Sequence, residues 1–194
     1  MRHSGSKARD RLLERVIILA AALLFSCTAV AGPFELEVSK RDQLLLVKED
    51  GQTIRKFHIA YGRGGDGSKA RLGDNKTPTG VYRITEFKSD SRFYYFMLLD
   101  YPSLLDAWRG YQNELINAMQ FRQIATAHRD HTVPPQNTAL GGYIGIHGIG
   151  DVNTEKLELH DKFNWTEGCI ALKNEEINEL RKYVTIGTRV TISE

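Results

Sequence analysis

Short runs of alternating apolar and polar residues fill the first half of the chain, and this pattern restricts the fold more than any other feature. Residues 34–38, Phe-Glu-Leu-Glu-Val, alternate as a half-buried strand does. Residues 43–48 and 52–60 form two further candidate strands, and the pair Asp50-Gly51 between them is typical of a tight hairpin turn. We therefore predict a sheet that contains this hairpin.

Later segments continue the strand pattern. Residues 80–85 alternate, residues 92–99 are rich in aromatic side chains, and residues 143–148 form a short apolar run. A last strand is expected at residues 189–192. Residues 61–79 contain five glycines and a proline near their end, which predicts a long surface loop.

Two segments carry a helical pattern instead. In residues 103–127 apolar side chains recur at steps of three and four, which predicts a helix that packs on the sheet. Alternatively, Gly110 breaks this helix and part of the segment covers the functional site as a lid. A second helix is expected to begin at Asn174, which would cap it, with Glu175 and Glu176 near the positive end of its dipole. The predicted fold class is mainly β with one or two helices, a β-rich α+β domain.

The first 31 residues have the composition of an export signal. Five basic residues precede an apolar run at 16–25, and Ala-Val-Ala at 29–31 is the small-x-small pattern at which signal peptidase cuts. The apolar run is shorter than the roughly 20 residues that span a bilayer. We predict a cleaved signal at 1–31, one domain at 32–194 with no transmembrane span, and a place in the periplasm or cell envelope. Lipid anchoring at Cys27, within a partial lipobox, is the alternative.

The charge of the domain argues against nucleic acid as a partner. The chain carries 26 Lys and Arg against 24 Asp and Glu. Five of the bases and two of the acids lie in the predicted signal, which leaves 21 bases and 22 acids in the domain. Binding to nucleic acid depends on dense contacts of Lys and Arg with phosphate, and a balance near neutrality does not provide them.

Cys169 is the candidate nucleophile. Because Cys27 lies in the predicted signal, Cys169 would have no internal disulfide partner after cleavage. His147, followed by Gly148, is the candidate base for such a thiol. Gly168 allows an unusual backbone angle before the cysteine, and the amides of Gly168 and Cys169 are candidate oxyanion donors. The alternative is that Cys169 is a small buried hydrophobic residue.

The other histidines do not form a recognisable metal motif. His128, His131 and His160 could be grouped with His147, but the sequence contains no His-Glu-x-x-His motif and no paired cysteines. We therefore expect no metal. His160 precedes the cysteine segment, and we interpret it as a substrate contact or as a support for the site.

Four segments follow one another in a fixed order along the domain. They are Thr-Pro-Thr-Gly-Val-Tyr at 77–82, Gly-Ile-His-Gly at 145–148, Trp-Thr-Glu-Gly-Cys-Ile-Ala-Leu at 165–172, and the closing strand at 184–192. Together they resemble the L,D-transpeptidase (YkuD-like) catalytic domain family of peptidoglycan enzymes, within it the Gly-Cys-Ile-Ala-Leu subgroup. The resemblance covers most of residues 34–192 and implies that family's β-rich sandwich or barrel.

The resemblance also implies a reaction. Cys169 would attack the carbonyl that joins the third, L-centred residue of a peptidoglycan stem peptide to D-alanine, with His147 as general base. The carbonyl of Gly148 would orient His147, and Thr166 matches the family's hydroxyl position. An amine of a neighbouring stem, or another acceptor, would resolve the thioester. The family needs no metal or cofactor for this reaction.

Two departures from the family pattern leave the acceptor open. Glu167 stands where many members have histidine, and Ala171 stands where many have an arginine that helps to bind substrate. One alternative is a hydrolase, an L,D-carboxypeptidase or amidase, that cleaves the same bonds or releases wall-bound protein. Another is a non-catalytic wall-binding module that keeps the fold.

Overall fold

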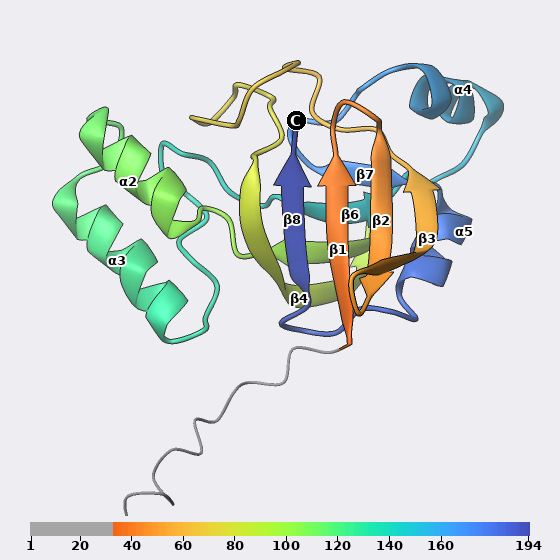
Figure 1. Ribbon diagram of the computed structural model, residues 1–194. Helices are drawn as coiled ribbons and strands as arrows, with labels where there is room; N and C mark the ends of the chain where they lie inside the picture. Colours follow the sequence, from red (N-terminus) through yellow and green to blue (C-terminus); the bar gives the residue numbers. More distant parts are fainter. Residues whose placement is uncertain (1–32) are drawn as a thin grey trace, which may run out of the picture. The chain divides into compact units, whose positions relative to one another are not determined.

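The structure is a computed structural model that describes residues 33–194 (Figure 1). The predicted signal at 1–31 and Cys27 lie outside the described residues. None of the helices in the described residues combines the length and the hydrophobicity that a membrane span requires.

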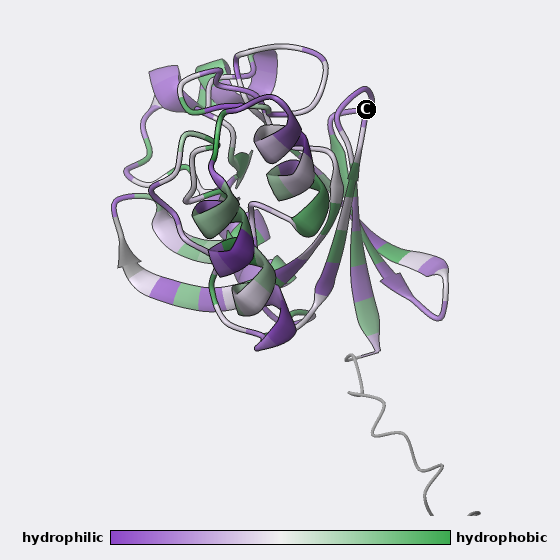
Figure 2. Ribbon diagram, turned by 90° about the vertical axis from the view of Figure 1, so that its left-hand side faces the viewer, coloured by the Kyte–Doolittle hydropathy of each residue, from purple (hydrophilic) through white to green (hydrophobic). Residues whose placement is uncertain are grey.

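Eight strands form one mixed sheet in the spatial order β3-β2-β1-β8-β4-β5-β6-β7. The strands are β1 (Phe34–Ser39), β2 (Leu44–Glu49), β3 (Gln52–His58), β4 (Gly80–Ser91), β5 (Tyr94–Leu99), β6 (Gly145–Gly148), β7 (Ile170–Leu172) and β8 (Arg189–Ser193). Figure 2 shows hydrophobic and hydrophilic residues alternating along the strands, as expected for strands with one buried face. The β-rich fold class is confirmed.

The hairpin between β2 and β3 turns where the sequence predicted it. Asp50 and Gly51 both have positive φ, 49° and 77°. Two consecutive residues with positive φ match the right-handed twist of the flanking strands, and Asp-Gly is suited to that geometry. The strand pairing shifts by one residue between Val47 and Lys48, close to the turn.

β4 joins two halves of the sheet that run in different directions. Its first residues, 80–83, pair with β8, whereas its later residues pair antiparallel with β5. The register of the pairing with β5 shifts between Ile84 and Glu86, near the change of partner. In Figure 1, β5, β6 and β7 therefore lie behind β1, β2 and β8 and cross them.

One apolar core fills the space between the two halves and the helix α5 (Asn174–Leu180). Burying each large aliphatic side chain of such a core stabilises the fold by roughly 1.5–3 kcal/mol. Its buried members include Leu36, Val38, Leu45, Tyr82, Met97, Ile146, Ile170, Ile177, Leu180 and Val190.

The single helix predicted at 103–127 is wrong, because two helices occupy this segment. They are α2 (Leu104–Gln112) and α3 (Ala118–Arg129), each begun by a capping box, at Ser103 and at Asn117. Gly110 does not break the helix. A Cβ atom there would lie 2.5 Å from the Leu140 side chain, so the glycine permits close packing inside α2.

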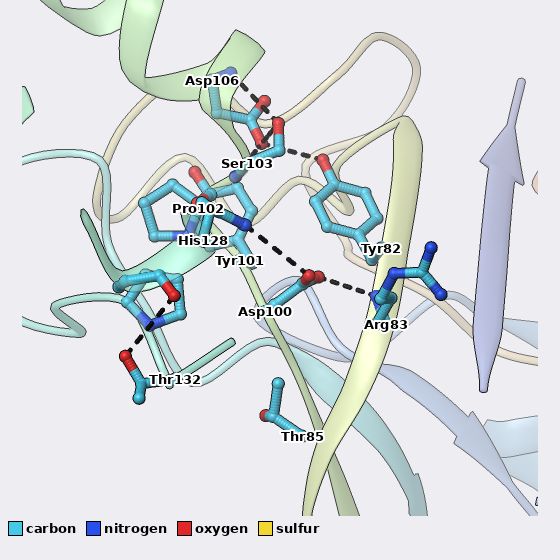
Figure 3. Close-up of polar contacts among 12 residues, drawn as sticks. Tyr82, Arg83, Thr85, Asp100, Tyr101, Pro102, Ser103, Asp106, His128 and Thr132 are labelled. Atoms are coloured by element: carbon cyan, nitrogen blue, oxygen red, sulfur yellow. Dashed lines mark hydrogen bonds and ion pairs between the residues drawn. The ribbon is translucent and has the colours of Figure 1, made fainter. Parts of the chain in front are cut away.

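A polar network attaches α2 and α3 to the sheet (Figure 3). The Tyr82 hydroxyl on β4 donates to the Asp106 carboxylate on α2 at 2.9 Å, and the Ser103 hydroxyl donates to the same oxygen. His128 on α3 lies 2.8 Å from the Pro102 carbonyl and 3.8 Å from the Asp100 carboxylate. Burial raises the pKa of Asp100. These contacts place the helical pair beside β4.

Two further helices complete the part of the chain that is described. α4 (Thr154–Lys162) was not predicted, and it raises the helix content above the expected one or two. α5 begins at Asn174 as its first residue, and Lys173 occupies the N-cap position instead. The capping role predicted for Asn174 is therefore wrong. The side chain of Glu176 accepts a hydrogen bond from the Lys173 amide at 3.0 Å and so closes the first turn.

Candidate active site

Parallel pairing of β6 with β7 brings the predicted base and nucleophile to one place. His147 on β6 pairs in register with Ala171 on β7, and Cys169 immediately precedes β7. Both side chains line the same cleft, whose volume is about 910 Å³. None of the described lining residues comes from α2 or α3, so these helices do not form the lid considered above.

Contacts of the His147 ring fix its tautomer and orientation. Nδ1 lies 2.6 Å from the Gly148 carbonyl, which can only accept, so Nδ1 carries the proton and Nε2 is left as an acceptor. The ring stacks on Phe93 at 4.2 Å between centroids, and Trp165 meets it edge-on at 6.0 Å. The residue is only 1% exposed, and burial lowers the pKa of His147 from 6.5 to about 4. The imidazole is therefore neutral at pH 7, as a general base must be.

The Cys169 thiol is protonated in the resting site. Sγ lies 3.3 Å from the Tyr143 carbonyl and donates to it. Burial raises the pKa of Cys169 to about 11, although a backbone hydrogen bond from Gly145 and the charges of Lys69 and Arg92 act in the opposite direction. The resting pair is therefore a thiol and a neutral imidazole. Its reaction requires proton transfer from sulfur during the attack.

The carbonyl that accepts the hydrogen bond from the Cys169 thiol belongs to Tyr143, a residue in the left-handed backbone conformation. Tyr143 has φ of 56°, a conformation that non-glycine residues adopt at a cost. Its amide donates to the Gln136 side-chain oxygen at 2.6 Å, and the Gln136 side-chain nitrogen donates to the Tyr101 carbonyl at 2.7 Å. These bonds hold the strained turn beside Cys169.

Thr166 ties the turn that presents the nucleophile. Its hydroxyl donates to the Cys169 carbonyl at 2.6 Å and accepts from the Gly168 amide at 3.2 Å. Gly168 has φ of 132°, and a Cβ atom there would lie 2.7 Å from the Lys76 carbonyl. Because the turn engages the Gly168 amide, the Cys169 amide is our remaining candidate for the oxyanion donor.

Gly148 has a second role besides its carbonyl. A Cβ atom at this position would lie 2.6 Å from the Asn174 side-chain oxygen and 2.9 Å from the Phe93 carbonyl. The absence of a side chain therefore lets the turn between β4 and β5 approach β6. This approach brings the Phe93 ring onto His147.

His160 lies behind the cleft and is not among its described lining residues. It is 1% exposed on α4, and its Nδ1 lies 3.5 Å from the Trp165 indole nitrogen, which donates to it. Its ring meets His58 edge-on at 5.9 Å between centroids. Burial lowers the pKa of His160 to about 4. Of the two roles considered for His160, this geometry favours support of the site through Trp165.

The other histidines grouped with His147 do not gather around it. His128 is bound to the Pro102 carbonyl beside the sheet, and His160 is in contact with Trp165. Among the side chains that the structure describes, no cluster of three or more His, Cys, Asp or Glu could hold a metal ion.

The contacts of Thr166 give a first testable prediction. Thr166→Val keeps the shape of this buried side chain but removes both hydrogen bonds, so we expect a loss of about 1–3 kcal/mol in the free energy of unfolding. Denaturant unfolding measures this loss. Thr166→Ser retains the hydroxyl and is the matched control. Equal stability of the valine and serine variants would contradict the assigned role.

Comparison with known proteins identifies the class to which this fold and site correspond. The family model of the L,D-transpeptidase catalytic domain (YkuD) matches residues 33–192. The chain therefore belongs to the L,D-transpeptidase catalytic domain family. It is 26% identical over 201 residues to the putative L,D-transpeptidase YafK of Escherichia coli K12. This alignment covers 89% of this chain and 65% of YafK. The chain thus spans less than two thirds of the length of this curated relative.

Solved structures share the fold at lower identity. Bd1075 of Bdellovibrio bacteriovorus matches with a TM-score of 0.54 and 21% identity, over 87% of this chain and 50% of that one. The helical cell shape determining protein Pgp2 of Campylobacter jejuni matches with a TM-score of 0.54 and 24% identity, over 84% of this chain and 48% of that one. At these low sequence identities, the structural similarity shows only that the fold is shared.

Several residues of the cleft were not singled out from the sequence. Phe93, Tyr143 and Arg92 all line it, but they lie far from the Cys169 segment along the chain. The aromatic run at 92–99 was the available signal for Phe93. The left-handed turn at Tyr143 carries no such signal, because it depends on Gln136.

Proposed function

We propose that this domain is a cysteine acyltransferase that acts on peptidoglycan stem peptides, with Cys169 as nucleophile and His147 as general base. One observation carries the proposal: Cys169 lines the same cleft as a buried, neutral histidine whose Nε2 is left as an acceptor. This arrangement suits attack by a thiol that loses its proton during the reaction.

The proposed acylation keeps atoms and charge in balance. The Cys169 sulfur bonds to the carbonyl carbon between the third stem residue and D-alanine, and its proton moves to Nε2 of His147. The negative charge on the carbonyl oxygen is met by the Cys169 amide. His147 then returns the proton to the nitrogen of D-alanine, the carbon–nitrogen bond breaks, and a thioester remains.

Deacylation repeats these roles with an acceptor. An amine or water attacks the thioester, His147 takes its proton, and the carbon–sulfur bond breaks as the thiol is reprotonated. With an amine the product is a cross-link or an attached protein. With water the enzyme is an L,D-carboxypeptidase or amidase, or releases wall-bound protein. Glu167, which is exposed and paired with Arg63 at 3.3 Å, stands at the position where relatives often have histidine, so we leave the acceptor open.

Mass spectrometry of the full chain with a synthetic donor tests the proposal and separates these outcomes. We expect a tetrapeptide stem ending in D-alanine to give a transient adduct on Cys169 that has lost D-alanine. With an amine acceptor present, a joined product would indicate transpeptidation, whereas a tripeptide alone would indicate hydrolysis. A protein that neither forms an adduct nor converts the donor would support the non-catalytic wall-binding module.

We further propose that the domain acts in the periplasm or cell envelope. The basic and apolar composition of residues 1–31 and the Ala-Val-Ala sequence at 29–31 support export by a cleaved signal. Lipid anchoring at Cys27 is the alternative route. Both place the domain where peptidoglycan stem peptides, and proteins attached to the wall, are its partners.

A further inference from the structure

The cleft around Cys169 carries an excess of positive charge. Among the described residues that line it, four side chains are basic and one is acidic. These residues are Arg63, Lys69, Lys88, Arg92 and Glu167. A cleft whose walls carry one sign of charge concentrates ligands of the opposite sign.

Three of the four bases already have acidic partners. Arg63 lies 3.3 Å from Glu167, Lys69 lies 2.8 Å from the Asp74 carboxylate, and Lys88 lies 3.4 Å from the Glu86 carboxylate. Arg92 differs, because it forms no ion pair with any side chain that the structure describes. Arg92 is also exposed and lines the cleft.

Packing fixes the place of Arg92 relative to the catalytic pair. Its guanidinium lies 4.6 Å above the centre of the Phe93 ring, and Phe93 in turn stacks on His147 at 4.2 Å. The backbone is held as well, since a Cβ atom at Gly150 would lie 2.3 Å from the Arg92 carbonyl. The turn between β4 and β5 thus rests directly on the segment that follows His147.

The charge of Arg92 acts on both catalytic groups. Burial is the main cause of the raised pKa of Cys169 and of the lowered pKa of His147, but the positive charge of Arg92 lowers both. Arg92 also lines the same cleft as Cys169 and His147. A ligand group bound by Arg92 would therefore lie near the scissile bond.

We propose that Arg92 is a specificity-determining residue that binds a carboxylate of the substrate close to the scissile carbonyl. The inference rests on the proposed function. The Arg92 guanidinium, whose Cζ lies over the Phe93 ring, carries a planar fork of N–H donors that matches a carboxylate with two parallel hydrogen bonds. A substrate with a primary amide at the same position offers one acceptor and no charge, and it binds more weakly.

Donor peptides in which each carboxylate is converted in turn to a primary amide test this proposal. For the full-length protein, we expect one of these amidations to lower kcat/KM by about 10- to 100-fold. In Arg92→Gln, kcat/KM for the free acid should fall to the value for that amide, and amidation should then have no further effect. Arg92→Lys, which keeps the charge without the fork, should recover part of the preference.

Arg181→Gln is the matched control. The guanidinium of Arg181 also lies over an aromatic ring, with Cζ 4.0 Å from the centre of Tyr95, but Arg181 is not among the described residues that line the cleft. This variant should keep the full preference for the free acid. The proposal would be overturned if the wild type showed no preference for the free acid. It would also be overturned if Arg92→Gln kept the preference of the wild type.

Binding to an inactive variant separates this inference from the proposed function. Calorimetry of Cys169→Ala with the same peptides should show the preference for the free acid, and Cys169→Ala combined with Arg92→Gln should lose it. If the preference is present without turnover by the wild type, the proposed reaction fails and the carboxylate site stands. If turnover occurs but Cys169→Ala binds acid and amide equally, the carboxylate site fails alone.

Discussion

Cys169→Ala should abolish conversion of the tetrapeptide donor, with a fall in rate of at least about 10³-fold, because the described residues that line the cleft include no second thiol to form the proposed thioester. The adduct on intact protein should disappear with it. Mass spectrometry of donor and protein measures both effects. The substitution removes one sulfur atom and leaves the turn bonded by Thr166 intact, since the Thr166 bond goes to the backbone carbonyl of Cys169.

Stability measurements distinguish loss of the nucleophile from loss of the fold. Cys169→Ala should unfold within a few degrees of the parent, because Cys169 is not among the buried residues that form the core. Cys169→Ser is the stricter control, since its hydroxyl can still donate to the Tyr143 carbonyl but attacks poorly. Activity retained by the alanine variant would show that Cys169 is structural.

Local patterns in the sequence were sufficient to predict much of the sheet. The Asp50-Gly51 turn was correct because its geometry depends on two residues that tolerate positive φ. β1 and the first part of β4 were predicted correctly because alternation reports which face of a strand is buried. The split of 103–127 also had a local signal that was missed: Asn117 and Gln120 have the spacing of a capping box, and their side chains form it.

Features that depend on distant contacts were not predictable in the same way. β7 has only three residues, and it exists because β6 pairs with it. The first part of β4 pairs with β8 and its later part pairs with β5, so this change of partner depends on two strands that lie elsewhere in the sequence. Prediction from sequence is therefore best for turns and for alternating strands, and poorest for strands such as β7 that form only against a distant partner.

The candidate site shows the same division. Cys169, His147 and Gly148 were proposed from short motifs, and the structure places Cys169 and His147 in one cleft. The surroundings that determine their chemistry come from elsewhere. Phe93 reaches His147 only because Gly148 has no side chain, and the lowered pKa of His147 follows from the resulting burial.

His147→Gln should lower kcat for the donor by about 10²- to 10⁴-fold, because it removes the group that takes the thiol proton and returns it to D-alanine. The protein should remain folded, although loss of the stacked ring exposes part of Phe93 and costs some stability. Thermal unfolding measures that cost separately from the rate. A variant that keeps wild-type kcat would exclude His147 as the base.

The pH dependence of the wild type tests the state of His147 more directly. The base must be neutral to accept a proton, so activity is lost as pH falls through its pKa. With that pKa lowered from 6.5 to about 4, kcat/KM should decrease only near pH 4 and stay level through neutrality. Arg92→Gln removes a charge that lowers this pKa, so its acid limb should move upward. A wild-type limb near 6.5 would mean that water reaches the imidazole during turnover, and burial by Phe93 and Trp165 would then not control the base.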